Sequence, residues 1–201
     1  MYDQWSEVVI VLTQRTDTDS GIKGMAQTSA RISYGFMCLT LCWGVFTATG
    51  WIKSLTGRKA LRNSHMVLGI LTLSFGVVHA MSFLFLPDGF TLAQITIPLL
   101  PGTLARHELG VLGLEVMIAV ALTGGISRFS SYRRFLWIHR LAYPAVAITA
   151  LHAFFGAMAN GHLGLLWFGG ITLLVPVVVL TALRFTPTRY LERLGLVEEL
   201  V

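Results

Sequence analysis

The chain has 201 residues, of which 54% are hydrophobic and only 12% are charged. This composition excludes an ordinary soluble domain of the same size, in which about 25% of the residues carry a charge. The formal net charge of +5 does not indicate nucleic-acid binding, because the basic residues stand in short segments between long apolar runs. We therefore predict an all-α integral membrane protein.

Five apolar stretches follow one another, each close to the roughly 20 residues that a helix needs to cross a bilayer. In chain order they are residues 32–51, 64–86, 107–126, 137–159 and 163–185. Gly, Pro or Ser stands at most of the breaks between them. The sequence predicts an N-terminal tail (1–31), a bundle of about five transmembrane helices (32–185) and a C-terminal tail (186–201).

The connecting segments differ in their content of Lys and Arg. Residues 52–63 contain four of these basic residues and residues 127–136 contain three, whereas residues 87–106 contain only Arg106 and residues 160–162 contain none. Because short basic loops stay on the cytoplasmic side of a membrane, we expect the C-terminus to be cytoplasmic and the N-terminus to lie outside. This pattern is typical of a multi-pass protein in a bacterial cytoplasmic membrane, surrounded by membrane lipid.

Four histidines lie inside the apolar stretches, where an ionisable side chain is costly and indicates function. His65 and His79 are on the second stretch, and His139 and His152 are on the fourth. A spacing of 14 residues places His65 and His79 about 21 Å apart on one helix face. One span separates the two helices, so they run parallel. His65 therefore lies level with His139, and His79 lies level with His152.

Two level pairs of histidines favour haem as the ligand. Neither pair belongs to the compact set of His, Cys, Asp and Glu that a closed zinc site requires, whereas axial histidine is an established haem ligand. No Cys-x-x-Cys-His motif occurs, so the haems are expected to be two non-covalent b haems, stacked along the helices. The alternative is that the histidines only bridge helices by hydrogen bonds.

Two local features bear on how these sites are built. Gly69, Thr72 and Gly76 share the helix face of His65 and would let a flat macrocycle approach the backbone. His139 and His152 are 13 residues apart, which leaves them about 140° out of phase on an ideal helix. Pro144 lies between them and removes a hydrogen bond, so we expect local overwinding to turn His152 toward the facing helix.

Two stretches resemble the ferric reductase-like transmembrane domain. They are RNSH (62–65), which continues to His79, and WIHRLAY (137–143), which continues to His152. This domain is shared by NADPH oxidases, eukaryotic ferric reductases and the haem-binding membrane subunit of the bacterial methionine sulfoxide reductase system. The resemblance implies that His65 with His139 binds the inner haem, and that His79 with His152 binds the outer one.

The sequence departs from that of the oxidases in two ways. They have six spans, and they carry a flavin and nicotinamide module after the last one, whereas sixteen residues follow Phe185 here. No Gly-rich phosphate motif follows a strand pattern. We therefore interpret the chain as an oxidoreductase component that receives electrons from a separate flavoprotein reductase or from quinol.

Basic and histidine residues near the two ends of the bundle have two interpretations each. Arg62, Arg134 and Arg140 stand beside the inner pair and could bind haem propionates, although topology alone predicts arginines there. His107 and His162 fall on the predicted outer side. They are either solvated or capping residues, or they bind a metal-ion substrate or the outer propionates.

Three functions are compatible with these residues. The first is a transmembrane electron conduit of the ferric-reductase type, with electrons passing from a cytoplasmic reductant to an outer acceptor. The second is a dihaem membrane anchor of a quinol-linked respiratory or reductase complex. The third is a structural or assembly subunit whose histidines bind nothing. We expect the first.

Overall fold

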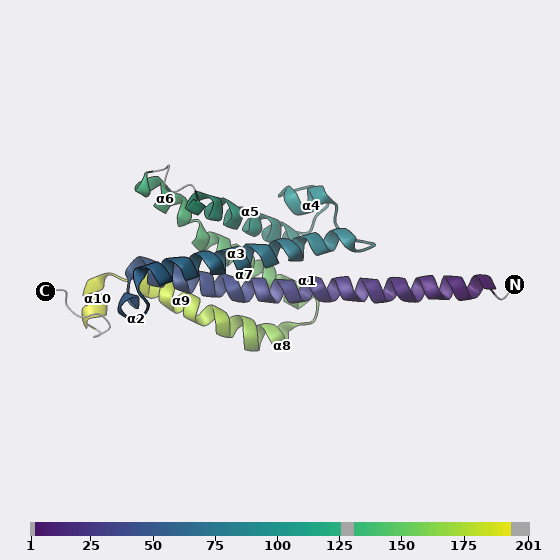
Figure 1. Ribbon diagram of the computed structural model, residues 1–201, viewed down its shortest axis with the longest axis horizontal. Helices are drawn as coiled ribbons and strands as arrows, with labels where there is room; N and C mark the ends of the chain where they lie inside the picture. The colour runs from purple at the N-terminus through teal and green to yellow at the C-terminus, as the bar shows by residue number, and fades with distance from the viewer. Residues whose placement is uncertain (1–2, 126–130, 194–201) are drawn as a thin grey trace.

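The computed structural model describes residues 3–125 and 131–193, and the regular secondary structure in this part of the chain is entirely helical, without strands (Figure 1). The α-helices are α1 (Asp3–Thr49), α2 (Lys53–Thr56), α3 (Arg58–Ser82), α4 (Leu92–Thr96), α5 (Ala105–Gly125), α6 (Tyr132–His139), α7 (Ala142–Ala159), α8 (Leu163–Leu165), α9 (Thr172–Phe185) and α10 (Thr188–Arg193). A 3₁₀ turn, η1 (Phe83–Phe85), follows α3, and a π-helical turn, η3 (Leu166–Ile171), precedes α9.

Within residues 3–125 and 131–193, five segments are long and apolar enough to cross a bilayer. They are Asp19–Thr49, Arg58–Phe85, Ala105–Gly125, Tyr132–Ala159 and Phe168–Phe185. Large apolar side chains on their outward faces are exposed, including Ile70, Leu122 and Val178, as expected of surfaces that contact lipid. The prediction of an all-α integral membrane protein with five transmembrane helices is confirmed.

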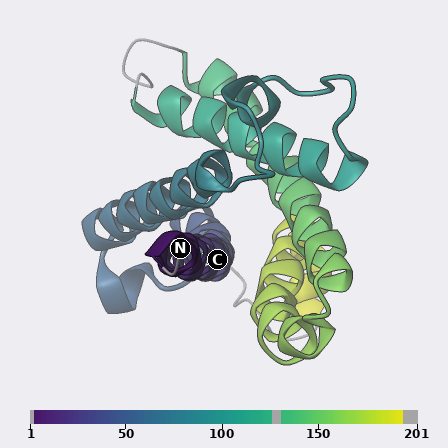
Figure 2. The same ribbon diagram turned by 90° about the vertical axis from the view of Figure 1, so that its right-hand side faces the viewer.

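Helix α1 packs against α3, α7 and α9. Figure 2 looks nearly along it and shows α3 on one side and α7 with α9 on the other. Met37, Cys38, Leu41 and Cys42 of α1 form a buried cluster with Val146 and Val177 from α7 and α9. Both cysteines are free thiols and are buried in this cluster. Hydroxyl groups join α1 to α3, where Ser33 Oγ donates to the Thr72 carbonyl over 2.8 Å.

The first helix is longer than the sequence predicts, because α1 continues through the region expected to be a tail and projects beyond the other helices (Figure 1). Its part from Asp19 onward already belongs to a candidate span. Ala26 and Ser29 are buried, and Ser29 Oγ donates to the Met25 carbonyl over 2.7 Å. This internal bond lets a polar residue enter the packed part of the bundle. The division into tails and domain stays a prediction.

The fourth span is interrupted between α6 and α7, at Arg140 and Leu141. The Leu141 amide donates to the Ile138 carbonyl over 2.9 Å, and the Tyr143 amide donates to the Arg140 carbonyl over 3.1 Å. Both bonds span three residues, and such turns advance about 120° per residue instead of 100°. Because Pro144 has no N–H, the Arg140 carbonyl is free for Tyr143. The expected overwinding is thus present, just before Pro144.

Candidate functional site

The structure places the four membrane histidines in two pairs. His65 of α3 and His139 at the end of α6 have ring centroids 5.9 Å apart, and His79 of α3 and His152 of α7 have ring centroids 6.1 Å apart. Two imidazoles on opposite sides of one metal ion, each with a nitrogen about 2 Å from it, have centroids roughly 6 Å apart. The partners that the sequence predicts are therefore neighbours, at a separation that suits a shared metal. Their role as ligands stays a prediction.

Three of the four rings are oriented by a backbone carbonyl on a neighbouring helix. His65 Nδ1 donates to the Thr40 carbonyl over 3.0 Å, His79 Nδ1 to the Ala26 carbonyl over 2.9 Å, and His152 Nδ1 to the Arg106 carbonyl over 2.6 Å. A carbonyl oxygen only accepts, so Nδ1 carries the proton in each ring. Nε2 therefore keeps its lone pair, as a metal-ligating histidine requires.

His139 is held differently. Its Nδ1 is buried and has no hydrogen-bond partner among residues 3–125 and 131–193. Its ring stacks on Phe135, with centroids 5.0 Å apart and an angle of 28° between the planes. Phe135 lies one helical turn earlier on α6, so an i, i+4 spacing brings the two rings together. Stacking thus orients this ring in place of a hydrogen bond.

Glycines provide the space for two of the rings. A Cβ atom at Gly110 of α5 would lie 2.7 Å from His152 Cε1, and one at Gly44 of α1 would lie 3.2 Å from His65 Cε1. Cβ atoms essentially never approach as closely as the first distance, so a side chain at Gly110 would displace the His152 ring. Close helix approach at both positions depends on the missing side chain.

Two of the small residues beside His65 pack against neighbouring helices. Thr72 is buried and its hydroxyl contacts the Thr40 hydroxyl of α1 at 3.1 Å. A Cβ atom at Gly76 would lie 3.3 Å from both Ser33 of α1 and Leu114 of α5. At Thr72 and Gly76 helix packing covers this face, so the interpretation of the face as a bed for a macrocycle gains no support there.

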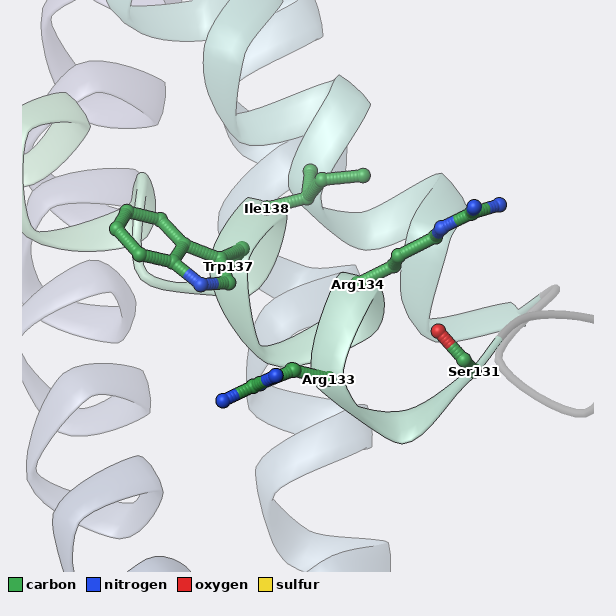
Figure 3. Close-up of a pocket in the computed structure, with 5 residues that line it drawn as sticks. All are labelled: Ser131, Arg133, Arg134, Trp137 and Ile138. Atoms are coloured by element: carbon green, nitrogen blue, oxygen red, sulfur yellow. The ribbon is translucent and has the colours of Figure 1, made fainter.

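Two open hollows lie at the basic end of the bundle. One, of about 400 Å³, is lined by Ser131, Arg133, Arg134, Trp137 and Ile138. Figure 3 shows Arg133 and Trp137 extending to one side of α6 and Arg134 with Ser131 to the other. The second hollow, of about 500 Å³, is lined by Arg58, Lys59, Arg62, Asn63 and Met66. No histidine lines either hollow, and Arg140 is exposed in the turn after α6.

His107 and His162 do not come together as a metal site. His107 is half-buried against Phe90, with ring centroids 4.6 Å apart, and its Nε2 accepts a hydrogen bond from Arg106 Nε over 3.1 Å. His162 is exposed in the turn after α7. Within the described ranges, no three residues among His, Cys, Asp and Glu are grouped to hold a metal ion. The metal-ion interpretation of these two histidines thus gains no support.

Sequence reasoning missed the groups that orient the rings. The carbonyls of Ala26, Thr40 and Arg106 leave no signal in a sequence, because every residue has one. Phe83 contacts His79 with ring centroids 5.2 Å apart. Phe135 could have been found, because it stands four residues before His139 within one helix.

The family of the chain is shown by a model of the ferric reductase like transmembrane component, which matches residues 29–150. This segment is more than half of the chain, so the chain belongs to that family, and the resemblance noted in the sequence is confirmed. The matched segment includes His65, His79 and His139 and ends just before His152.

The chain is also similar to an individual protein. The chain is 29% identical over 135 residues to the protein-methionine-sulfoxide reductase heme-binding subunit MsrQ of Rhodospirillum rubrum. The alignment covers 67% of this chain and 62% of the relative, so the chain matches less than two thirds of that protein's length. No solved structure matches the chain.

Proposed function

We propose that this protein carries electrons across the membrane through two non-covalent b haems, each bound between the histidines of one pair. The observation that supports this most is the pairing itself. Four histidines at membrane depth form two pairs with ring separations of 5.9 and 6.1 Å. Bound haem would supply a reversible ferric and ferrous iron couple. The histidine-bridge alternative accounts for the three Nδ1 bonds to neighbouring helices but not for the paired spacing of the rings.

The protein's own residues would prepare both sites. His65 and His139 would bind the inner haem, and His79 and His152 the outer one. Carbonyls on α1 and α5 accept the Nδ1 protons of three of these rings, which leaves the Nε2 atom of each with a lone pair for a metal. His65 and His79 are separated by about 21 Å of α3, so two short transfers would span most of a roughly 30 Å apolar core.

We further propose that electrons enter at the basic end and leave at the other. Arg58, Arg62, Arg133 and Arg134 line the two hollows there and would attract an acidic flavoprotein in a salt-sensitive way. By the positive-inside rule this end is cytoplasmic. The R. rubrum relative is named as the haem-binding subunit of a methionine-sulfoxide reductase. This name supports a separate reductase protein as a partner, and we propose that this partner is the acceptor on the outer side.

Haem content is the direct test. Purified full-length protein should give a pyridine haemochrome ratio of about two b haems per chain, with low-spin bis-histidine spectra. A ratio near zero in well-folded protein would rule out the electron conduit. Reduction by an added flavin reductase, compared with reduction by quinol analogues, then separates the flavoprotein donor from a quinol donor.

A further inference from the structure

Arg106 and His107, at the start of α5, form a polar pair whose hydrogen bonds are incomplete. Arg106 Nε donates to His107 Nε2 over 3.1 Å. Because Nε2 accepts this bond, the neutral imidazole carries its proton on Nδ1. That Nδ1 atom is buried, and the described part of the chain offers it no acceptor. A buried donor without an acceptor is destabilising unless a ligand supplies one.

This polar pair belongs to the wall of the outer histidine site. His152 Nδ1 donates to the Arg106 carbonyl over 2.6 Å, which connects one outer histidine directly to the pair. A series of ring contacts connects the other. His79 contacts Phe83, Phe83 contacts Phe90, and Phe90 contacts His107, with centroids 5.2, 5.6 and 4.6 Å apart. Both outer histidines are therefore connected by contacts to the Arg106–His107 pair.

The positive charge of Arg106 is not matched by Glu108, which stands two residues further along α5. Both carboxylate oxygens of Glu108 accept hydrogen bonds within the preceding loop, one from the Leu99 amide and one from the Thr103 hydroxyl. In residues 3–125 and 131–193, no carboxylate is paired with the Arg106 guanidinium. A cation and an unpaired N–H donor are thus adjacent at the outer site, which is the combination that binds a carboxylate.

We propose that Arg106 and His107 bind a propionate carboxylate of the outer haem. The Arg106 guanidinium supplies charge and N–H donors, and His107 Nδ1 supplies a further donor. Arg106 has a second function that substitution leaves intact, because its backbone carbonyl orients His152. This inference rests on the proposed function, since it requires haem at His79 and His152.

The test compares haem with haem dimethyl ester, in which both propionates are uncharged esters. The full-length protein carries His65→Ala, so that only the outer site is loaded, and the rate of haem loss to excess apomyoglobin is measured. Arg106→Gln removes the guanidinium and keeps the carbonyl. His107→Phe keeps an aromatic ring against Phe90 and removes both nitrogens. His162→Phe, at an exposed histidine, is the matched control.

We expect haem to be lost about tenfold faster from Arg106→Gln and His107→Phe than from the parent, while loss of the ester changes little. The parent should lose haem more slowly than it loses the ester. The His162→Phe variant should behave like the parent. Equal acceleration for haem and ester in the variants would show a structural role and overturn the inference. A parent that loses haem and haem dimethyl ester at the same rate would also overturn the inference. If the parent binds neither compound, the proposed function itself fails.

Discussion

The inner and outer histidine pairs have almost the same ring separation, 5.9 and 6.1 Å, but different supports. In the outer pair both rings donate an Nδ1–H to a backbone carbonyl, from Ala26 and from Arg106. In the inner pair only His65 does so, and His139 depends on stacking against Phe135. The outer pair also lies against the closer glycine, Gly110.

Two sites with the same ligands are therefore not equally pre-organised when their rings are held by different contacts. A ring fixed by a hydrogen bond loses less freedom on binding a ligand than one fixed by stacking alone. We therefore expect the outer site to bind haem more tightly than the inner site. The inner site is instead flanked by the basic hollows, where a soluble donor would dock. The outer pair would thus hold its haem more tightly, and the inner pair would be the one that a soluble donor can approach.

The largest expected effect comes from removing a ligand. His79→Ala or His152→Ala should lower the haem content from about two to about one per chain by losing the outer haem, and His65→Ala or His139→Ala should lose the inner one. Pyridine haemochrome assays and redox titration of the remaining haem measure this. His162→Ala is the control and should keep both. Loss of both haems from every single variant would contradict the division into two independent pairs.

The two glycines give the next largest effect and compare the pairs directly. Gly110→Ala should displace the His152 ring, because its Cβ would lie 2.7 Å from Cε1, whereas Gly44→Ala at 3.2 Å from His65 should be milder. Overpacking of this kind costs about 1–3 kcal/mol. We expect Gly110→Ala to lower haem retention at the outer site and the melting temperature.

Gly156→Ala is the matched control for this comparison, since no atom lies within 4 Å of a Cβ placed there. It should leave haem content unchanged. A Gly110→Ala variant that retained the outer haem as well as the Gly156→Ala variant would show that the His152 ring is not confined by α5.

A smaller effect is expected from the aromatic supports. Phe135→Leu removes the stacking on His139, worth about 0.5–1.5 kcal/mol, and should speed loss of the inner haem several-fold in an apomyoglobin transfer assay. Phe83→Leu removes the contact with His79, but the Ala26 carbonyl still holds that ring. It should therefore have less effect on the outer haem. A larger effect of Phe83→Leu than of Phe135→Leu would mean that stacking, and not the carbonyl bonds, orients the rings.

Changes of surface charge should have the smallest effect on haem binding. They should still change the rate at which the inner haem is reduced. Reversing Arg58 and Arg133 to Glu should slow reduction of the inner haem by an acidic flavoprotein and weaken its dependence on salt, with haem content unchanged. Stopped-flow reduction over a range of ionic strength measures this. Lys23→Glu, exposed on the outer half of α1, is the control. Inner-haem reduction that ignores both charge and salt would favour a quinol donor.

The five spans and the histidine pairing could be predicted from the sequence because both depend on local or additive properties. Apolar content over about 20 residues identifies a span. The helical rise sets the depth of a residue, and the single span between the two helices makes them parallel. These quantities are the same wherever the helices pack. Span length, helical rise and helix direction are sufficient to match His65 with His139 and His79 with His152.

What surrounds each ring depended on the tertiary structure, because it is set by how each helix is rotated against its neighbours. The rotation of α3 turns Gly76 toward Ser33 and Leu114, and the break between α6 and α7 separates the helix of His139 from the helix of His152. The sequence likewise does not distinguish the carbonyl of Ala26 from any other. Only the packing of α1 along α3, through a segment whose polarity suggested a tail, brings it to His79 Nδ1.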